Sequence, residues 1–369
     1  MAGTSRFAYI DSARAIAASL VVWQHAAAVG ADLAPQVSNR WMADIPGGVD
    51  LGRIGVIVFF AISGYVIPGS LDPADRAAGR KFLIRRFFRL FPAYWLSLPL
   101  GWIALWAIYG RHLPASDIAL NLTMAPSLFG ATEIIGLYWT LAYELAFYAM
   151  CLGLWRCGLL ARAWTTVLLC HLALAGGAIL LLASIYTTKP EFSGWALSCF
   201  FYGVMFTGAA WRRWRDGAMT GRGERLALLG VLLVWFLALP LGCAGVLAVS
   251  GRRIDYFVEM PLGYVVGLLI FVLLTTVAKI GWRPLAWLGL VSYSLYLFHP
   301  VVLYALQRLG QLWPPARLDL GLFVALEFAL AIALSAAIFH GLERPAIGLG
   351  RRLSGRPRRA PLTPAEEVI

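Results

Sequence analysis

The sequence predicts an all-α fold, a polytopic transmembrane helix bundle with about ten spans and both termini in the cytoplasm. The first observation is composition: 60% of the 369 residues are hydrophobic and 14% are charged, whereas a soluble domain is about 45–50% apolar and about 25% charged. The second is that apolar stretches of spanning length recur along the whole chain. The third is the uneven distribution of Lys and Arg between the segments that join these stretches.

Each apolar stretch is close to the roughly 20 residues that a spanning helix needs. They cover approximately residues 10–29, 54–71, 91–110, 137–155, 163–185, 195–211, 226–249, 257–278, 285–306 and 319–341. The first has spanning length and lacks a small-residue cleavage pattern, so we expect no secretory signal. We expect residues 1–345 to form one transmembrane domain and residues 346–369 to form a basic, disordered cytoplasmic tail.

The net charge of +12 is explained by membrane topology. With the N-terminus in the cytoplasm, roughly two thirds of the Lys and Arg residues fall in inner segments, as the positive-inside rule requires. This distribution favours an even number of spans and leaves no need for nucleic acid as a partner. The basic segment from Arg351 to Arg359 is expected to attract anionic lipid.

The five cysteines lie in or beside predicted spans. Their spacing indicates neither a disulfide framework nor a metal site. We therefore expect no metal and no permanently bound cofactor.

Arg14 and His25 are the most informative pair in the chain. Eleven residues separate them on the first apolar stretch, which places both on one helix face, about 16 Å apart along the axis. Asp11 joins the same stripe. Ionisable side chains inside a spanning helix are costly and usually face a functional interior. The plainer interpretation is an Asp11–Arg14 ion pair at the helix entrance and a histidine without function.

Four titratable groups are predicted to lie at one depth. Counting the helical rise from each membrane face places His25, Glu144, His299 and Glu327 within about one helical turn of each other. An imidazole beside a carboxylate is the usual pair of a general base and its orienting partner. Two simpler interpretations remain open: His299 could bond a carbonyl freed by Pro300, and Glu327 could bond a neighbouring helix.

Cations alternate with aromatic residues in residues 81–95, just before the third predicted span. Such a stretch can contact anionic lipid headgroups at the membrane interface. Arg85, Arg86 and Arg89 could equally bind the phosphates of a soluble co-substrate, because guanidinium groups make bidentate contacts with phosphate. Charge alone does not choose between these two partners.

Six segments follow one another in a recognisable order. They are YIDSARAIA at 9–17, GVIVFFAISGY at 55–65, RRFFRLFPAYW at 85–95, WTLAYELAFY at 139–148, SYSLYLFH at 292–299 and ERP at 343–345. In this order they resemble the acyltransferase-3 family of bacterial membrane acyltransferases, which modify surface glycans and some secondary metabolites. The Arg14–His25 spacing reproduces that family's Arg-x10-His motif. Two positions depart from the family pattern: Ile57 stands where the family often has Asp, and Leu145 stands where it has a second Glu.

The resemblance implies a multi-pass O-acyltransferase of the inner membrane, most simply an O-acetyltransferase. Its co-substrate would be cytoplasmic acyl-CoA, and its acceptor a hydroxyl of a glycan or lipid-linked sugar, such as O-antigen or exopolysaccharide. His25 would accept the hydroxyl proton and Glu144 would orient the imidazole. Arg14, with its rotamer held by Asp11, would contact the donor.

Further roles follow from the same resemblance. Arg85, Arg86 and Arg89 would bind donor phosphates. The acceptor would be bound by Asp50, Tyr138, Trp139 and His299. An acyl-His25 intermediate is the alternative to direct transfer.

Two other functions fit the buried His and Glu residues. One is a proton-coupled transporter or flippase that uses His25 and Glu144 as a proton relay. The other is a scaffold for envelope assembly without catalysis. The oligomeric state is open.

Overall fold

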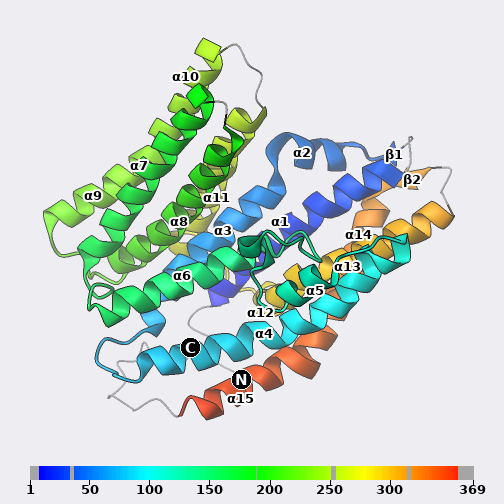
Figure 1. Ribbon diagram of the computed structural model, residues 1–369. Helices are drawn as coiled ribbons and strands as arrows, with labels where there is room; N and C mark the ends of the chain where they lie inside the picture. Colours follow the sequence, from blue (N-terminus) through cyan, green and yellow to red (C-terminus); the bar gives the residue numbers. More distant parts are fainter. Residues whose placement is uncertain (1–7, 34–36, 188, 251–254, 314–316, 356–369) are drawn as a thin grey trace. The chain divides into compact units, whose positions relative to one another are not determined.

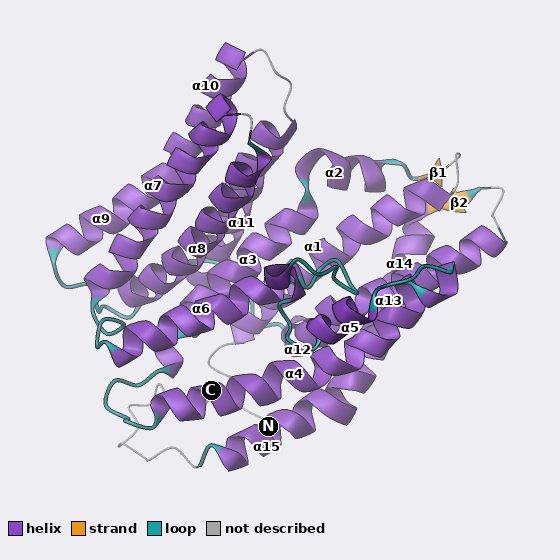
Figure 2. Cartoon of the chain, in the orientation of Figure 1, coloured by secondary structure: helices purple, strands orange, loops and turns teal. Residues whose placement is uncertain are grey.

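The computed structural model describes residues 8–33, 37–187, 189–250, 255–313 and 317–355, and nearly all regular structure in these ranges is helical (Figures 1 and 2). The α-helices are α1 (Ala8–Leu33), α2 (Trp41–Val49), α3 (Leu51–Val66), α4 (Ala78–Leu105), α5 (Ala115–Asn121), α6 (Trp139–Arg156), α7 (Ala163–Thr187), α8 (Pro190–Arg215), α9 (Arg222–Leu233), α10 (Leu239–Ser250), α11 (Asp255–Thr276), α12 (Arg283–Leu290), α13 (Ser292–Leu312), α14 (Leu320–Ile338) and α15 (Arg344–Leu353).

The remaining elements are short. The described residues include three 3₁₀ turns, η1 (Pro68–Ser70), η2 (Ala107–Tyr109) and η3 (Pro126–Phe129), and two π-helical turns, η4 (Val234–Ala238) and η5 (Phe339–Glu343). Strands β1 (Val37–Ser38) and β2 (Leu318–Asp319) pair in parallel over two residues each. This helical architecture agrees with the predicted fold class.

The chain divides into two compact units. The first contains residues 1–55, 80–142 and 272–369, and the second contains residues 56–79 and 143–271. Because α3 and α6 each begin in the first unit and continue in the second, each unit is assembled from distant parts of the sequence.

The first unit is built around α1, and small residues let its neighbours approach closely. A Cβ added at Gly289 of α12 would overlap the backbone carbonyl of Asp11, and one added at Gly55 of α3 would lie 2.5 Å from the carbonyl oxygen of Ala17. Small residues at helix contacts are the usual means of close packing in a bilayer. Immediately after Gly289 and Leu290, Val291 leaves helical geometry, and α12 and α13 are bent by 71°.

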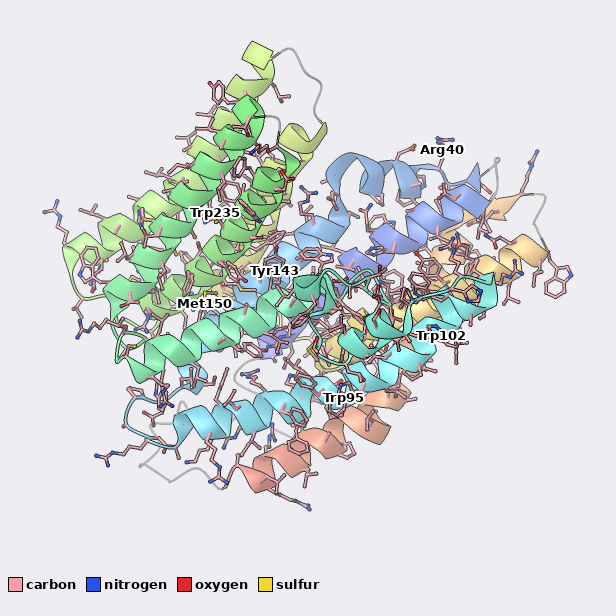
Figure 3. All side chains as sticks on the ribbon, viewed as in Figure 1. Arg40, Trp95, Trp102, Tyr143, Met150 and Trp235 are labelled. Atoms are coloured by element: carbon pink, nitrogen blue, oxygen red, sulfur yellow. The ribbon has the colours of Figure 1, made fainter. Side chains whose placement is uncertain are left out.

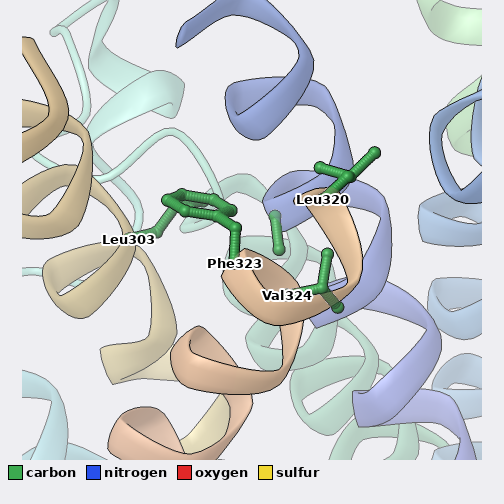
Figure 4. Close-up of a cluster of buried hydrophobic side chains, with 5 residues drawn as sticks. Leu303, Leu320, Phe323 and Val324 are labelled. Atoms are coloured by element: carbon green, nitrogen blue, oxygen red, sulfur yellow. The ribbon is translucent and has the colours of Figure 1, made fainter. Parts of the chain in front are cut away.

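One apolar cluster sets the register of three helices. Ala26 of α1, Leu303 of α13, and Leu320, Phe323 and Val324 of α14 are all buried and pack together (Figure 4). Helices α13 and α14 follow each other in the chain and run in opposite directions. The contact therefore puts the helical turn that precedes Leu303 in α13 at the same level as the turn that follows Val324 in α14.

The end of α14 changes its helical pitch before α15 begins. Pro345 follows the π-turn η5, and it has no N–H for the usual helical bond to an upstream carbonyl. Helix α15 then lies alongside the first part of α4 (Figure 1), with Gly350 against Phe88 and the Arg85 Nε donating to Ser354 Oγ at 2.9 Å. The predicted tail boundary at residue 345 therefore falls inside regular structure, because this packing keeps the chain helical to Leu353. Residues 356–369 lie outside the described residues.

A loop before α6 carries a partly buried acid, Glu133. The Glu133 Oε2 accepts the backbone N–H of Trp139 at 3.0 Å. Burial raises the pKa of the Glu133 carboxyl to about 7, although hydrogen bonds from Trp139 and Ser127 act in the opposite direction. The neighbouring Tyr94 ring packs edge-on against Tyr138 at 4.8 Å.

The second unit holds its helices together through backbone contact and aromatic packing. A Cβ at Gly64 of α3 would overlap the carbonyl of Met205, and one at Gly208 of α8 would overlap that of Ala61. Trp235, labelled in Figure 3, lies in the π-turn η4. It is fully buried, and its indole Nε1 donates to Thr207 Oγ1 at 2.9 Å. The Trp235 ring also stacks on Tyr264 at 5.2 Å.

Six helices in the described parts of the chain are long and apolar enough to cross a membrane, and the bent pair α12–α13 could be a seventh span. The six are Ala8–Leu33, Leu51–Ser70, Ala78–Tyr109, Ala163–Thr187, Arg222–Ala248 and Leu320–Leu353. The predicted count of ten also uses α6, α8 and α11, and it stays a prediction.

Gly289→Ala should destabilise the first unit. The added methyl group meets backbone rather than a movable side chain, so the cost should reach about 3 kcal/mol, the upper part of the usual range for overpacking. Thermal unfolding in detergent, followed by circular dichroism, measures the change. Gly153→Ala in α6 is the control, because its Cβ would meet nothing within 4 Å and alanine favours a helix. A Gly289→Ala protein as stable as wild type would contradict the close contact.

Glu133→Gln should stabilise the protein at alkaline pH only. The folded carboxyl has a raised pKa of about 7, so folding takes up a proton between pH ~4.5 and ~7 and wild-type stability falls as pH rises through that window. At pH 8 the variant should melt ~2–4 °C higher, and at pH 4 the two proteins should melt together. Melting curves across this range test the sign, and a difference that persists at pH 4 would refute the assignment.

Candidate functional site

Two ion pairs, contributed by α1, α4 and η5 with a hydrogen bond from α13, lie near the start of α1 and form an ion network, because each arginine also acts electrostatically on the carboxylate of the other pair. Arg14 Nη1 lies 3.4 Å from Asp11 Oδ1 on α1 itself. Arg89 Nη1 of α4 lies 3.4 Å from Glu343 Oε1, and Ser294 Oγ of α13 donates to Glu343 Oε2 at 2.7 Å. The predicted Asp11–Arg14 contact is therefore present and is part of a larger set of charges.

Glu343 is the member of this network to which the sequence pattern assigned no role. Its side chain is completely buried while Arg89 stays 27% exposed. The one sequence feature that could have identified Glu343 is the ERP segment at 343–345. This segment resembles a family motif but does not indicate which residue Glu343 contacts. A buried carboxylate needs a cation and hydrogen-bond donors to offset its desolvation, and Arg89 and Ser294 supply them.

His25 presents one ring nitrogen for chemistry. Its Nδ1 lies 2.8 Å from the backbone oxygen of Val21. A carbonyl oxygen only accepts, so in the neutral imidazole the proton sits on Nδ1 and the lone pair on Nε2. The side chain is half-buried and therefore accessible. A partly exposed imidazole with a fixed tautomer is suited to act as a general base or a nucleophile.

His299 lies directly beside His25. The two ring centroids are 5.4 Å apart, with an interplanar angle of 49°. His299 has no exposed surface, and its Nδ1 is 3.0 Å from the carbonyl oxygen of Leu295. This contact agrees with the prediction that the two histidines lie at one depth. The fold covers His299 with other side chains, although the family resemblance suggested acceptor binding for it.

Asp50 is the carboxylate of the first unit whose charge acts on His25. It follows α2 in a left-handed backbone conformation, with φ 49°. Its Oδ1 accepts the backbone N–H of Arg53 at 2.9 Å, and its Oδ2 lies 3.0 Å from Arg53 Nε. These bonds cap the start of α3 and hold the carboxylate in one orientation.

Glu144 belongs to the second unit. Its Oε1 accepts hydrogen bonds from the Tyr148 hydroxyl and, at 3.5 Å, from Ser63 Oγ of α3. Its side chain is partly exposed. The predicted pairing of Glu144 with His25 stays a prediction.

The two aromatic residues expected to bind the acceptor differ in exposure. Tyr138 is completely buried, and its hydroxyl bonds Ser97 at 2.7 Å. Trp139 is partly exposed at the first position of α6. Nearby, Thr140 Oγ1 and the Tyr296 hydroxyl bond at 2.8 Å and link α6 to α13.

The three arginines expected to bind the donor have different surroundings. Arg89 pairs with Glu343, and Arg85 donates to Ser354. The Arg86 guanidinium lies 5.5 Å from the Phe82 ring centroid. No group of three or more His, Cys, Asp or Glu side chains within the described ranges could hold a metal ion.

The chain matches one protein-family model, and two relatives from other bacteria, along most of its length. A family model described as an acyltransferase domain matches residues 7–340. The exopolysaccharide production protein ExoZ of Rhizobium meliloti is 26% identical over 82% of this chain and 91% of its own length. No solved structure matches the chain.

Two other relatives are longer than the matched region. "Nodulation protein 10" of Rhizobium leguminosarum bv. viciae is 29% identical over 40% of this chain and 44% of its own length. "Putative peptidoglycan O-acetyltransferase YrhL" of Bacillus subtilis is 26% identical over 80% of this chain and 50% of its own length. This chain thus spans half or less of each of these two relatives.

The family match covers the segments that carry both histidines, Glu144 and most of the ion network. The apolar helices are those of a multi-pass membrane protein. The predicted family is confirmed: the chain belongs to the acyltransferase family of this domain and is an enzyme that transfers acyl groups.

Proposed function

We propose that the protein is an inner-membrane O-acyltransferase, and specifically an O-acetyltransferase, that moves the acyl group of cytoplasmic acyl-CoA to a hydroxyl of a glycan. The observation that carries the proposal is His25, an accessible imidazole with its lone pair on Nε2, on the same helix as Arg14. The names of ExoZ, an exopolysaccharide production protein, and of YrhL, a putative peptidoglycan O-acetyltransferase, support a glycan acceptor.

In this mechanism His25 Nε2 takes the proton of the acceptor hydroxyl as its oxygen attacks the thioester carbonyl. The carbon–sulfur bond then breaks, and the CoA thiolate takes the proton back from His25. Atoms and charges balance, because the acceptor gains the acyl group and CoA leaves as a thiol. Asp50, and Glu144 as predicted, would stabilise the imidazolium formed between these steps.

The ion network would receive the donor's charged end. Arg14 and His25 are about 16 Å apart along α1, a span that a pantetheine arm can bridge. Arg14 and the three arginines of α4, Arg85, Arg86 and Arg89, would contact the phosphates at the inner end, and the thioester would reach His25. Asp50 and the partly exposed Trp139 would contribute to acceptor binding.

We also propose ten spans with both termini in the cytoplasm. Helices α6, α8 and α11, together with the bent pair, would supply the spans beyond the six most apolar helices. This topology places the donor arginines of α4 on the cytoplasmic side, where acyl-CoA is found, and anionic lipid would contact the basic surface of α15.

His25→Ala should abolish acyl transfer. Purified protein is mixed with acetyl-CoA and a glycan acceptor, and release of free CoA thiol is followed. Loss of the base should reduce kcat/KM at least 10²-fold. His171→Ala is the matched control, because His171 makes the same bond to a backbone carbonyl four residues earlier, at 2.9 Å. Retention of more than a few per cent of activity by His25→Ala would contradict the base assignment, and no thiol release by wild type would favour the transporter alternative.

Arg86→Ala should weaken donor binding, whereas Arg89→Ala should lower the stability of the fold. Arg86 is partly exposed and stacked on Phe82, so its loss should raise the KM for acyl-CoA about tenfold with little effect on melting temperature. Arg89 compensates the buried Glu343, so its loss should lower the melting temperature by about 5 °C. Steady-state kinetics and thermal unfolding of both variants separate the roles. An unchanged KM in Arg86→Ala would assign Arg86 to lipid contact.

A further inference from the structure

The second imidazole, His299, has an unused lone pair. Its Nδ1 faces the carbonyl oxygen of Leu295, so in the neutral ring the Nε2 carries the lone pair. That Nε2 is buried and has no hydrogen-bond partner among the described residues. Buried polar atoms are nearly always bonded in folded proteins, so an exception calls for an explanation.

The neighbour of this atom is His25. The ring centroids are 5.4 Å apart and no hydrogen bond joins the two rings in the described structure, so a bond between the two Nε2 atoms needs a small rotation of the His25 ring to bring them to about 3 Å. The backbone bonds place a proton on Nδ1 of both rings, so two neutral rings offer each other only lone pairs and cannot bond. When His25 gains a proton on Nε2, it becomes a donor and His299 Nε2 becomes its acceptor.

Other charged groups around the pair are few. The field of Asp50 reaches His25, and Asp50 is itself paired with Arg53. On α14, Glu327 is fully buried, and neither of its carboxylate oxygens has a partner in the described structure. His299 precedes Leu303 by one turn and Glu327 follows Val324 by one turn, so the contact in Figure 4 places both at about the same level. On the remaining helices packed against the pair, Arg14 and Asp11 lie about three and four turns from His25 towards the start of α1. Asp44 of α2 pairs with Arg40, and Arg283 begins α12.

We propose that His299 is a positioning residue for His25: its buried Nε2 accepts a hydrogen bond from the protonated His25 and so stabilises the imidazolium. The inference rests on the proposed function for its catalytic meaning, because the imidazolium is the intermediate between proton removal from the acceptor and proton return to the thiolate. No proton is transferred to His299. The proton stays on His25, and His299 only accepts a hydrogen bond from it.

The test measures His25 directly, without acyl transfer. Diethyl pyrocarbonate modifies neutral imidazole, so the pH dependence of its reaction at His25, read by peptide mass spectrometry, gives the midpoint of protonation. The full-length protein in detergent is used, and the exposed His112 serves as a reference in the same sample. His299, which is completely buried, is shielded from the reagent.

His299→Leu removes the acceptor and should lower the His25 midpoint by about one pH unit, because a hydrogen bond to a charged group is lost. His299→Gln retains an acceptor oxygen and should preserve the midpoint. His299→Met is the second apolar replacement if the leucine variant fails to fold. His171→Leu is the matched control and should leave the His25 midpoint unchanged. In the acyl-transfer assay, the acid limb of the kcat/KM profile should move with the midpoint.

An unchanged midpoint in a folded His299→Leu or His299→Met protein would overturn the proposal, as would an equal shift in His299→Gln. The effect of His299→Leu should persist in a Glu327→Gln background, and its disappearance there would assign the effect to Glu327. If the midpoint shifts but no acyl transfer is found in wild type, the hydrogen bond stands and the proposed function fails.

Discussion

The first unit depends on how closely its helices can approach α1. Gly289 and Gly55 bring α12 and α3 against the backbone of Asp11 and Ala17, at distances that leave no room for a Cβ. Lipid provides no hydrophobic force between helices, so such association relies on close van der Waals contact and interhelical bonds. A bulkier residue at either contact would move the polar stripe of α1 away from its partners.

That close packing determines how the polar groups of α1 are accommodated. At the beginning of α1, Asp11 and Arg14 join a network that includes Arg89 and the buried Glu343. About three turns beyond Arg14, His25 meets a second histidine from α13. Both histidines bond the carbonyl four residues before them, which satisfies one ring nitrogen without any other side chain. In the neutral rings these bonds keep the proton on Nδ1, so both Nε2 atoms carry a lone pair. A hydrogen bond within one helix therefore fixes which ring nitrogen can accept a proton.

Much of the site could be predicted because the helical period and rise fix where its side chains lie on each helix. The helical period places Arg14 and His25 on one face, and the spacing of Asp11 and Arg14 permits the ion pair that is observed. The helical rise, counted from opposite ends of two spans, places His25 and His299 at one level, and their rings do meet. The influence of the Asp50 charge on His25 was not foreseen, because it depends on the turn between α2 and α3 rather than on a helical repeat.

The sequence by itself determined the helical membrane class, the family and the candidate base, because hydropathy, helical periodicity and motif order are local properties of the chain. Only the tertiary structure decided the partners: Glu343 with Arg89 over 254 positions, and the burial of His299 and Tyr138. It also decided that α15 continues as a helix on α4 where a disordered tail was expected. These outcomes depend on which helix faces meet, and side-chain packing between distant segments has no periodic signature in the sequence.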